Sequence, residues 1–376
     1  MNIIDIYTIF CYNIVNILEG LLIMSLRARA RTSSAKMHSA YRKTRNFVGA
    51  ATVAAGVTAS LLAMFLPINL LQVGQLYKSV RDFATSSADS SVSAAPVQAP
   101  VQGCDVRNTT DTNIFAECPS FALNYATAKS GIVDQQYLNV TSGRSTTNNE
   151  AETYTASTQN LRVENGALLL EAHREISGQT VRYTSAKVDT KGKKDFTYGK
   201  LVIQAKVPTG VGTWPAIWML PSAPKYAGLG NVDAKYRYLN DGEIDILEAI
   251  GSQPGTVYSV AHNVTYDNNG VDRKYFNTVQ VPNNNVNFQT YELNWTPTNL
   301  TFKINGQPYF SYDKPANADY KTWPYDQPFY LVMNLALGGN WAGQDRANFP
   351  ENGIDGNALP TSLQIKSVHY YPYILK

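Results

Sequence analysis

The chain has few charged residues and few cysteines. Only 16% of its 376 residues are charged, which is low for a cytosolic enzyme, and it has 3 cysteines. The net charge is +3, but the basic residues are concentrated in residues 27–45, a segment without acids that contains Arg27, Arg29, Arg31, Lys36, Arg42, Lys43 and Arg45. The rest of the chain is close to neutral, so we expect it to bind no nucleic acid.

Two of the three cysteines, Cys104 and Cys118, flank a short polar segment. In an extracellular protein this arrangement predicts a disulfide bond between them, whereas in a reducing compartment they would be two unrelated free thiols. Cys11 lies in the N-terminal stretch, and we expect it to stay apart from this pair.

No charged residue occurs from Asn46 to Tyr77, and residues 47–72 are mostly Ala, Val, Leu and Met. A helix of that length, at about 1.5 Å per residue, spans a bilayer core of roughly 30 Å. The basic segment before it predicts a signal-anchor with a cytoplasmic N-terminus. A cleaved signal peptide would have an unusually long apolar core, and a buried soluble helix is rarely apolar around its whole circumference.

These features divide the chain into four parts. Residues 1–46 are predicted to be a cytoplasmic basic segment, although translation could also begin at Met24 or Met37, and residues 47–72 the transmembrane helix. Residues 73–119 are Ser/Ala/Pro-rich and are predicted to be a disordered tether that includes the Cys104–Cys118 loop. Residues 120–376 form the folded domain.

The folded domain has the sequence pattern of an all-β protein. Short alternating runs such as Lys200–Val207 and Leu300–Ile304 recur between turn residues, and no long segment keeps a helical period. Asn165-Gly166 and Asn305-Gly306 are typical hairpin turns. Many short strands with tight turns indicate a β-sandwich or a barrel.

The segment Glu243–Glu248 places three carboxylates in an apolar, β-branched run. Strict alternation would put Glu243 and Asp245 on one face of a strand and Glu248 on the other. One β-bulge, a feature common beside active sites, would bring all three acids to the same face. The segment contains no basic residue that would pair with them on a solvated face, and it lacks the spacing of a calcium-binding loop. Carboxylates paired in this way are the groups that cleave glycosidic bonds.

Four segments in a fixed order resemble glycoside hydrolase family 16, and within it the laminarinase-type endo-β-1,3-glucanases. They are Tyr198–Lys200, Trp214–Pro221, Gly242–Glu248 and Asn334–Trp341. The resemblance covers roughly residues 145–372, and the extra residue between Asp245 and Glu248 is similar to the laminarinase branch. It implies a jelly-roll β-sandwich of two curved antiparallel sheets, with a substrate cleft across the concave sheet.

The resemblance also implies retaining hydrolysis, with Glu243 as the nucleophile, Glu248 as the general acid/base and Asp245 orienting Glu243. The two catalytic carboxyl groups of retaining enzymes lie about 5–5.5 Å apart. Because the general acid must begin the reaction protonated, the pKa of Glu248 should lie above that of a free glutamate.

Several residues are predicted to contact the substrate. Trp214 and Trp218 lie four residues apart on one strand and therefore on one face, although core packing is the alternative for any tryptophan. His262 either faces the cleft or has a structural role. The resemblance adds residues at the rim of the cleft, namely Asn148, Asn149, Glu152, Asn340 and Trp341. Trp295 and Trp323 are expected to pack structurally.

The sequence departs from the family at Lys366, where many members have an aspartate that helps to bind a structural calcium ion. A lysine cannot ligate calcium, so we expect no metal and no other cofactor. The expected partners are a β-glucan and, through residues 47–72, a membrane, with the protein a monomer. The catalytic domain would be extracellular, or secreted if the anchor is cleaved. Two alternatives stay open, a cell-wall transglycosylase and an inactive glucan-binding sandwich. The intact acids argue against the inactive sandwich alone.

Overall fold

The structure is a computed structural model that describes residues 114–133, 135–230, 239–265 and 275–374. The predicted basic segment, transmembrane helix and most of the tether lie outside the described residues, as do Cys11 and Cys104. Among the residues that are described, no helix has both the length and the apolar character needed to cross a membrane.

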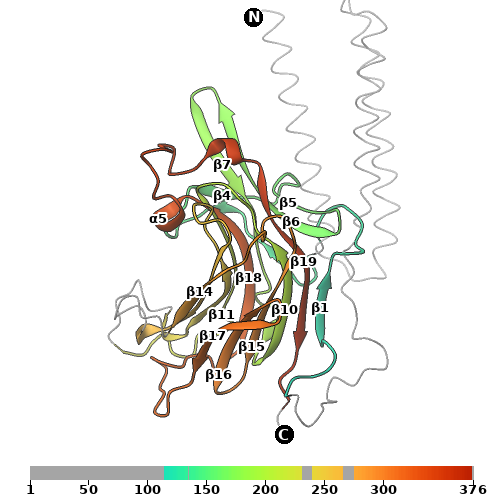
Figure 1. Cartoon of the computed structure of the whole chain (residues 1–376), viewed down its shortest axis with the longest axis vertical. Helices are drawn as coiled ribbons and strands as arrows, with labels where there is room; N and C mark the ends of the chain where they lie inside the picture. Colours follow the sequence, from blue (N-terminus) through green and yellow to red (C-terminus); the bar gives the residue numbers. More distant parts are fainter. Residues whose placement is uncertain (1–113, 134, 231–238, 266–274, 375–376) are drawn as a thin grey trace, which may run out of the picture. The chain divides into compact units, whose positions relative to one another are not determined.

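The described residues form an all-β sandwich of two sheets, which confirms the predicted fold class (Figure 1). The 11-stranded sheet has the order β17 (Gln307–Asp313), β16 (Asn299–Ile304), β15 (Gln289–Trp295), β10 (Gly199–Lys206), β19 (Thr361–Tyr371), β6 (Ala167–Ser177), β7 (Thr180–Ser185), β4 (Glu152–Tyr154) and β3 (Gly143–Arg144), with β1 (Phe121–Asn124) on β19 and β5 (Leu161–Glu164) on β6.

The 8-stranded sheet carries the candidate site. Its order is β14 (Phe276–Gln280), β13 (Thr256–His262), β12 (Glu243–Glu248), β11 (Thr213–Pro221), β18 (Phe329–Leu337), β8 (Lys187–Asp189) and β2 (Asn139–Val140), with β9 (Asp195–Phe196) on β18. Two short helices, α5 (Gly339–Ala342) and η2 (Gly356–Ala358), follow β18. The pairs are antiparallel except for β4 and β7, which run parallel, so the expectation of purely antiparallel sheets is wrong there.

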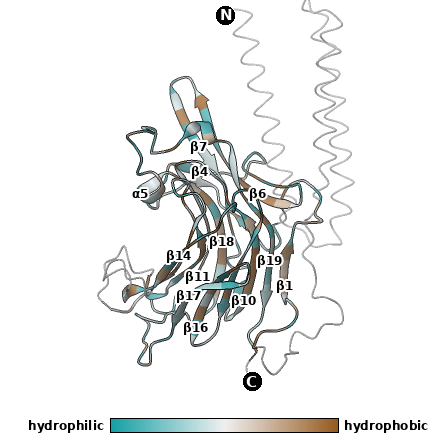
Figure 2. Cartoon of the chain, viewed as in Figure 1, coloured by the Kyte–Doolittle hydropathy of each residue, from teal (hydrophilic) through white to brown (hydrophobic). Residues whose placement is uncertain are grey.

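Alternation of residue types produces these strands. In β10 every second residue is buried, with Leu201, Ile203 and Ala205 turned into the core, as a strand with one solvated face requires. Figure 2 shows hydrophobic and hydrophilic residues mixed along many of the strands. β18 is the exception, since all of its residues are buried. It lies between β11 and β8 within the sheet.

The two predicted hairpins form. Asn165 and Gly166 connect β5 to β6 with φ of 51° and 75°, and Asn305 and Gly306 connect β16 to β17 with φ of 52° and 80°. Two successive residues at positive φ are the signature of the type I′ turn, whose twist matches that of the flanking strands.

The core lies between the sheets. Ile217 and Met219 of β11 meet residues of the larger sheet such as Leu201 and Ile203, and all four are completely buried. Trp295 and Trp323 belong to the same core, which confirms their predicted structural role. The side chains of β11, β12 and β18 that alternate with core residues therefore point to the opposite face of the 8-stranded sheet.

Candidate active site

A β-bulge in β12 brings the three acids together. Opposite β13, Glu243 pairs with His262, Asp245 with Val260 and Glu248 with Tyr258. Asp245 and Glu248 are three positions apart on β12, whereas their partners on β13 are only two positions apart. The register of β12 with β11 shifts at the same place. The extra residue turns Glu248 to the side of Asp245, as the spacing of the acids predicted.

Gly242 makes the entry into β12 possible. Its φ is +79°, and a Cβ atom there would lie 2.7 Å from Cγ of Pro324 and 2.9 Å from Cε1 of Tyr325. A larger residue would therefore need both a strained backbone and a shift of the neighbouring loop. The glycine fixes the point at which Glu243 emerges on the face of the sheet.

Glu243, Asp245 and His262 form a compact charged group. Nε2 of His262 lies 3.0 Å from Oδ2 of Asp245 and 3.9 Å from Oε1 of Glu243. One donor atom from each residue falls within 4.8 Å of the other two, so the group could hold a small cation. The imidazole already lies between the two carboxylates, however, where its charged form would offset their repulsion. The prediction that His262 faces the site agrees with this position.

Glu248 has the properties of a general acid. Burial, followed by the charge of Asp245, raises the pKa of Glu248 to about 8, while His262 and a bond from Trp214 act in the opposite direction. The carboxyl is therefore protonated at neutral pH. The residue is only half-buried, so it remains accessible from the site face.

Trp214 holds Glu248 directly. Its Nε1–H donates to Oε1 of Glu248 at 2.9 Å. The Trp214 ring also makes an edge-to-face contact with Trp341, whose centroid is 5.1 Å away, and Trp341 makes a similar contact with Tyr258 at 4.9 Å. Sequence reasoning placed Trp214 in the site but missed the bond to Glu248, because that bond depends on the pairing of β11 with β12.

The short helix α5, which carries Trp341, is tied to the loop before β4. Nδ2 of Asn149 donates to Oδ1 of Asn340 at 2.7 Å, and the backbone N–H of Asn340 donates to the carbonyl of Asn148 at 2.8 Å. Gly339 has φ of +74°, and a Cβ atom there would lie 2.9 Å from the same carbonyl. Asn149, Asn340 and Trp341 are thus brought together, as the sequence predicted.

Glu152 does not line the rim, which corrects the sequence prediction. It is completely buried, and its Oε2 accepts the backbone N–H of Leu337 at 2.8 Å. Glu152 and Tyr154 point inward while Thr153 points outward, as alternation along β4 requires. The acid beside α5 is Glu150, whose position directly after Asn148 and Asn149 could have identified it.

Burial and the charge of Glu150 raise the pKa of Glu152 to about 8. The side chain of Glu150 is itself mostly buried and accepts hydrogen bonds from Ser145 at 2.5 Å and Thr147 at 3.3 Å. Two carboxyls thus lie close enough to interact, and Glu152 keeps its proton at neutral pH.

Comparison with known proteins places this arrangement in a family. The family model described as glycosyl hydrolases family 16 matches residues 148–352, which contain all three acids of β12. The chain belongs to glycosyl hydrolases family 16. It is therefore a glycoside hydrolase.

Two relatives of this family 16 enzyme and one solved structure are informative. The chain is 36% identical over 233 residues to a β-glucanase of Rhodothermus marinus, covering 60% of this chain and 76% of that protein. It is 31% identical over 242 residues to glucan endo-1,3-β-glucosidase A1 of Niallia circulans, covering 60% of this chain but only 32% of that protein. The X-ray structure of the laminarinase from Rhodothermus marinus superposes with a TM-score of 0.59 at 33% identity, covering 68% of this chain and 98% of that one.

The surroundings of Lys366 do not fit the calcium site of other family 16 members. The Nζ atoms of Lys366 and Lys206 each lie 5.7 Å from the ring centroid of Phe288. Two ammonium groups around one ring create a positive region, where a divalent cation would be repelled. The residues present at this position therefore do not suit the ion.

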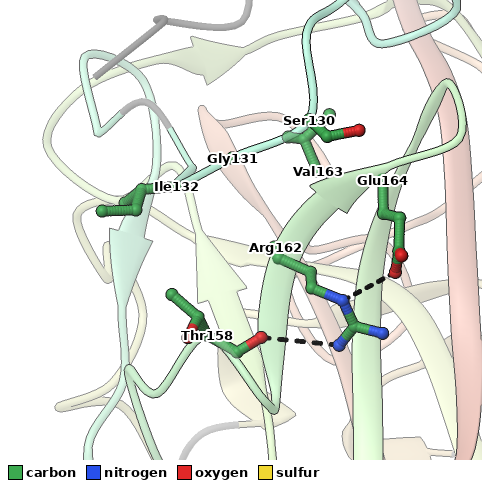
Figure 3. Close-up of a pocket in the computed structure, with 7 residues that line it drawn as sticks. All are labelled: Ser130, Gly131, Ile132, Thr158, Arg162, Val163 and Glu164. Atoms are coloured by element: carbon green, nitrogen blue, oxygen red, sulfur yellow. Dashed lines mark hydrogen bonds and ion pairs between the residues drawn. The ribbon is translucent and has the colours of Figure 1, made fainter. Parts of the chain in front are cut away.

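A pocket of about 200 Å³ is lined by residues of β5 and of two preceding segments, and none of the acids of β12 lines it (Figure 3). Its basic lining residue is Arg162, which already donates to Glu164 at 2.8 Å, Glu171 at 2.9 Å and the carbonyl of Gln159 at 2.8 Å. Because the guanidinium of Arg162 already makes these hydrogen bonds, the pocket is poorly suited to bind an anionic ligand.

Cys118 is disulfide-bonded, as predicted for this residue. Its partner lies outside the described residues, so the pairing with Cys104 stays a prediction.

Proposed function

We propose that the protein is a retaining endo-β-1,3-glucanase and that the site face of the 8-stranded sheet is its substrate cleft. The observation that carries the proposal is the bulged β12 strand, which gathers Glu243, Asp245 and Glu248 and gives Glu248 a pKa of about 8. The printed names of the relatives, a β-glucanase, an endo-1,3-β-glucosidase and a laminarinase, support the substrate class.

In the first step, an oxygen of Glu243 attacks the anomeric carbon of the bound glucan and forms a glycosyl ester. The bond from that carbon to the glycosidic oxygen breaks, and Glu248 gives its proton to the departing oxygen. Asp245 and His262, whose contacting atoms lie 3.0 Å apart, orient the carboxylate of Glu243, which lies 3.9 Å from Nε2 of His262.

In the second step, the deprotonated Glu248 removes a proton from water, and the resulting oxygen attacks the same carbon. The ester bond to Glu243 breaks, and the anomeric configuration is restored after two inversions. The burial and the negative neighbour that raise the pKa of Glu248 also make its carboxylate an effective base.

Substrate binding falls to the aromatic residues around the acids. Trp218 lies opposite Asp245 in the register, and Trp341 lies beside Trp214 at the Glu248 end. Aromatic faces suit the apolar faces of glucosyl rings, and the Asn149–Asn340 pair offers hydrogen bonds at the edge of the cleft. We propose that these residues and His262 line the substrate cleft, and that the sandwich is a jelly roll of the laminarinase type.

We also propose that the catalytic domain, residues 120–376, is held at the outer surface of a membrane. The support is the uncharged stretch at residues 47–72, preceded by basic residues and followed by a Ser/Ala/Pro-rich tether to Cys104 and Cys118. Protease added to intact cells should release an active monomeric domain. Activity that stays with the cytosol after lysis would contradict the anchor.

Two other activities could use this site. A transglycosylase would employ Glu243 and Glu248 with a sugar in place of water as the acceptor, and a glucan-binding sandwich would not need them. Mass analysis of the products separates the three, because hydrolysis shortens laminarin chains, transglycosylation also lengthens some, and a binding protein releases nothing.

The test of the proposed function is product analysis on laminarin, lichenan and xyloglucan. We expect laminarin to be cleaved internally and fastest, with little turnover of xyloglucan, because the extra residue between Asp245 and Glu248 is similar to the laminarinase branch. Equal or better turnover of xyloglucan would contradict the linkage preference.

A further inference from the structure

A chain of hydrogen bonds begins at Trp218 and runs from the site face into the sandwich. Nε1 of Trp218 donates to Oδ1 of Asn334 at 2.7 Å, and Nδ2 of Asn334 donates to the hydroxyl of Tyr154 at 3.2 Å. The three residues come from β11, β18 and β4, which are distant in the sequence. These hydrogen bonds therefore join an aromatic residue of the site to the interior, and only the folded structure brings their partners together.

The chain ends at a buried carboxyl. The carboxyl of Glu152 lies close enough to Tyr154 to help raise the pKa of its hydroxyl, an effect that comes mainly from burial, and Oε2 of Glu152 accepts the backbone N–H of Leu337 at 2.8 Å. Asn334, Tyr154 and Glu152 are 7%, 5% and 0% exposed, so water does not readily replace any of these partners. Each buried polar group depends on its neighbour in the chain.

The chemistry of the groups fixes the direction of the chain. An indole N–H can only donate, so the side-chain amide of Asn334 must turn its oxygen to Trp218 and its nitrogen to Tyr154. Flipping the amide would place its N–H donors against the N–H of Trp218, and the indole would lose its buried partner, which is costly. The indole of Trp218 is thereby restricted to one orientation.

Trp218 lies where substrate would bind. It pairs with Asp245 across β11 and β12, its side chain is only half-buried, and Nζ of Lys187 sits 5.1 Å from its ring centroid. The ring is therefore attached at its nitrogen to the interior while part of its surface faces the site.

We propose that Asn334, itself held by Tyr154 and Glu152, is a positioning residue that fixes the indole of Trp218 for binding of a glucosyl unit. The inference rests on the proposed function, since it takes Trp218 to contact the glucan. Asn334 acts through Trp218 and need not touch the sugar. Its loss should weaken substrate binding more than it slows the chemical steps.

The first test is independent of catalysis. In protein labelled with 5-fluorotryptophan, the ¹⁹F resonance that disappears in Trp218→Phe belongs to Trp218. Asn334→Leu and the milder Tyr154→Phe should both shift or split that resonance. Trp295, a buried tryptophan whose Nε1 donates to the carbonyl of Tyr325 at 3.1 Å, is the internal control and should not move. A Trp218 resonance unaffected by both variants would overturn the proposal.

The second test is a double-mutant cycle on laminarin. Asn334→Leu should raise KM about tenfold and change kcat by less than about threefold, the pattern of lost binding. In the Trp218→Phe background, Asn334→Leu should add little, because the two residues act as one unit. Effects on KM that multiply, or a fall in kcat alone, would contradict the positioning role.

The two tests separate failure of this inference from failure of the proposed function. A wild-type protein that leaves laminarin intact would refute the proposed function and, with it, the glucan-binding part of the inference. The fluorine spectra would still decide whether Asn334 and Tyr154 fix the indole of Trp218. Tyr154→Phe removes only one oxygen atom, so it tests the chain even if Asn334→Leu fails to fold.

Discussion

Two carboxyls in this protein have the same raised pKa in different surroundings. Glu248 and Glu152 both reach about 8, in each case mainly through burial and secondly through a neighbouring acid, Asp245 for Glu248 and Glu150 for Glu152. Glu248 is only partly buried, whereas Glu152 is completely buried. A raised pKa thus identifies a possible proton donor, but access to substrate decides which carboxyl can take part in catalysis.

The largest expected difference between the two glutamates is in turnover. Glu248→Gln should lower laminarin hydrolysis about 10²–10⁴-fold, because an amide cannot supply the proton to the leaving oxygen. Glu243→Gln should be at least as severe, since it removes the nucleophile. Glu152→Gln is the matched control, and its kcat should stay within about tenfold of the wild type. Comparable losses in Glu248→Gln and Glu152→Gln would break the comparison.

The pH dependence of activity should report Glu248. Its carboxyl must carry a proton in the free enzyme, so kcat/KM should fall as the pH rises through about 8. The Trp214 N–H favours the charged form of Glu248, so Trp214→Phe should move this limb to higher pH and lower the maximum rate. The pH–rate profiles of both proteins measure the effect. A shift to lower pH would show that the bond has the opposite influence.

The pH dependence of stability should report Glu152. Its pKa is about 8 when folded and 4.5 in the absence of the fold, so the folded protein binds the proton more tightly. This contribution is fully present below about pH 4.5 and is lost as the pH rises through 8. It amounts to a few kcal/mol at most.

Glu248 contributes to stability in the same direction as Glu152, so the wild type alone does not separate the two. Glu152→Gln should weaken the fall in the free energy of unfolding between pH 5 and 8. Urea unfolding at several pH values provides the measurement. A slope identical to that of the wild type would mean that Glu152 is ionised throughout.

The smallest expected effect concerns calcium. Lys366 and Lys206 surround Phe288 where many family members would bind the ion, so EDTA should leave the melting temperature unchanged. A bound ion at a hundredfold excess over its Kd would add about 2.7 kcal/mol, which chelation would remove. A drop in chelator that calcium reverses would contradict this expectation. Lys366→Asp should make the melting temperature respond to calcium.

The sequence predicted the strands and the bulge because both depend on local spacing. Acids at positions 243, 245 and 248 cannot share a face without one extra residue, and the structure has it. The hairpins at Asn165-Gly166 and Asn305-Gly306 are equally local, since they follow from the backbone preferences of two residues.

The sequence-based prediction is wrong or incomplete where the pairing between strands determines the position and contacts of a side chain. Glu152 was placed at the rim although the acid beside α5 is Glu150. The pairing of β4 with β7 and the hydrogen bond from Leu337 to Glu152, which join distant parts of the sequence, cover Glu152. The bonds from Trp214 to Glu248 and from Trp218 to Asn334 join residues 34 and 116 positions apart, and only the fold brings them together.

The central claim is that Glu243 attacks the sugar while Glu248 handles the proton. A β-glucoside with fluorine at position 2 and a good leaving group should form a long-lived ester. The fluorine slows both formation and hydrolysis of the ester, whereas the good leaving group speeds only its formation, so the ester accumulates. Mass spectrometry of the digested protein then locates the label. The account predicts one glycosyl group on Glu243 in the wild type and none in Glu243→Gln. A label on Glu248, or turnover without any trapped ester and with inverted product, would contradict it.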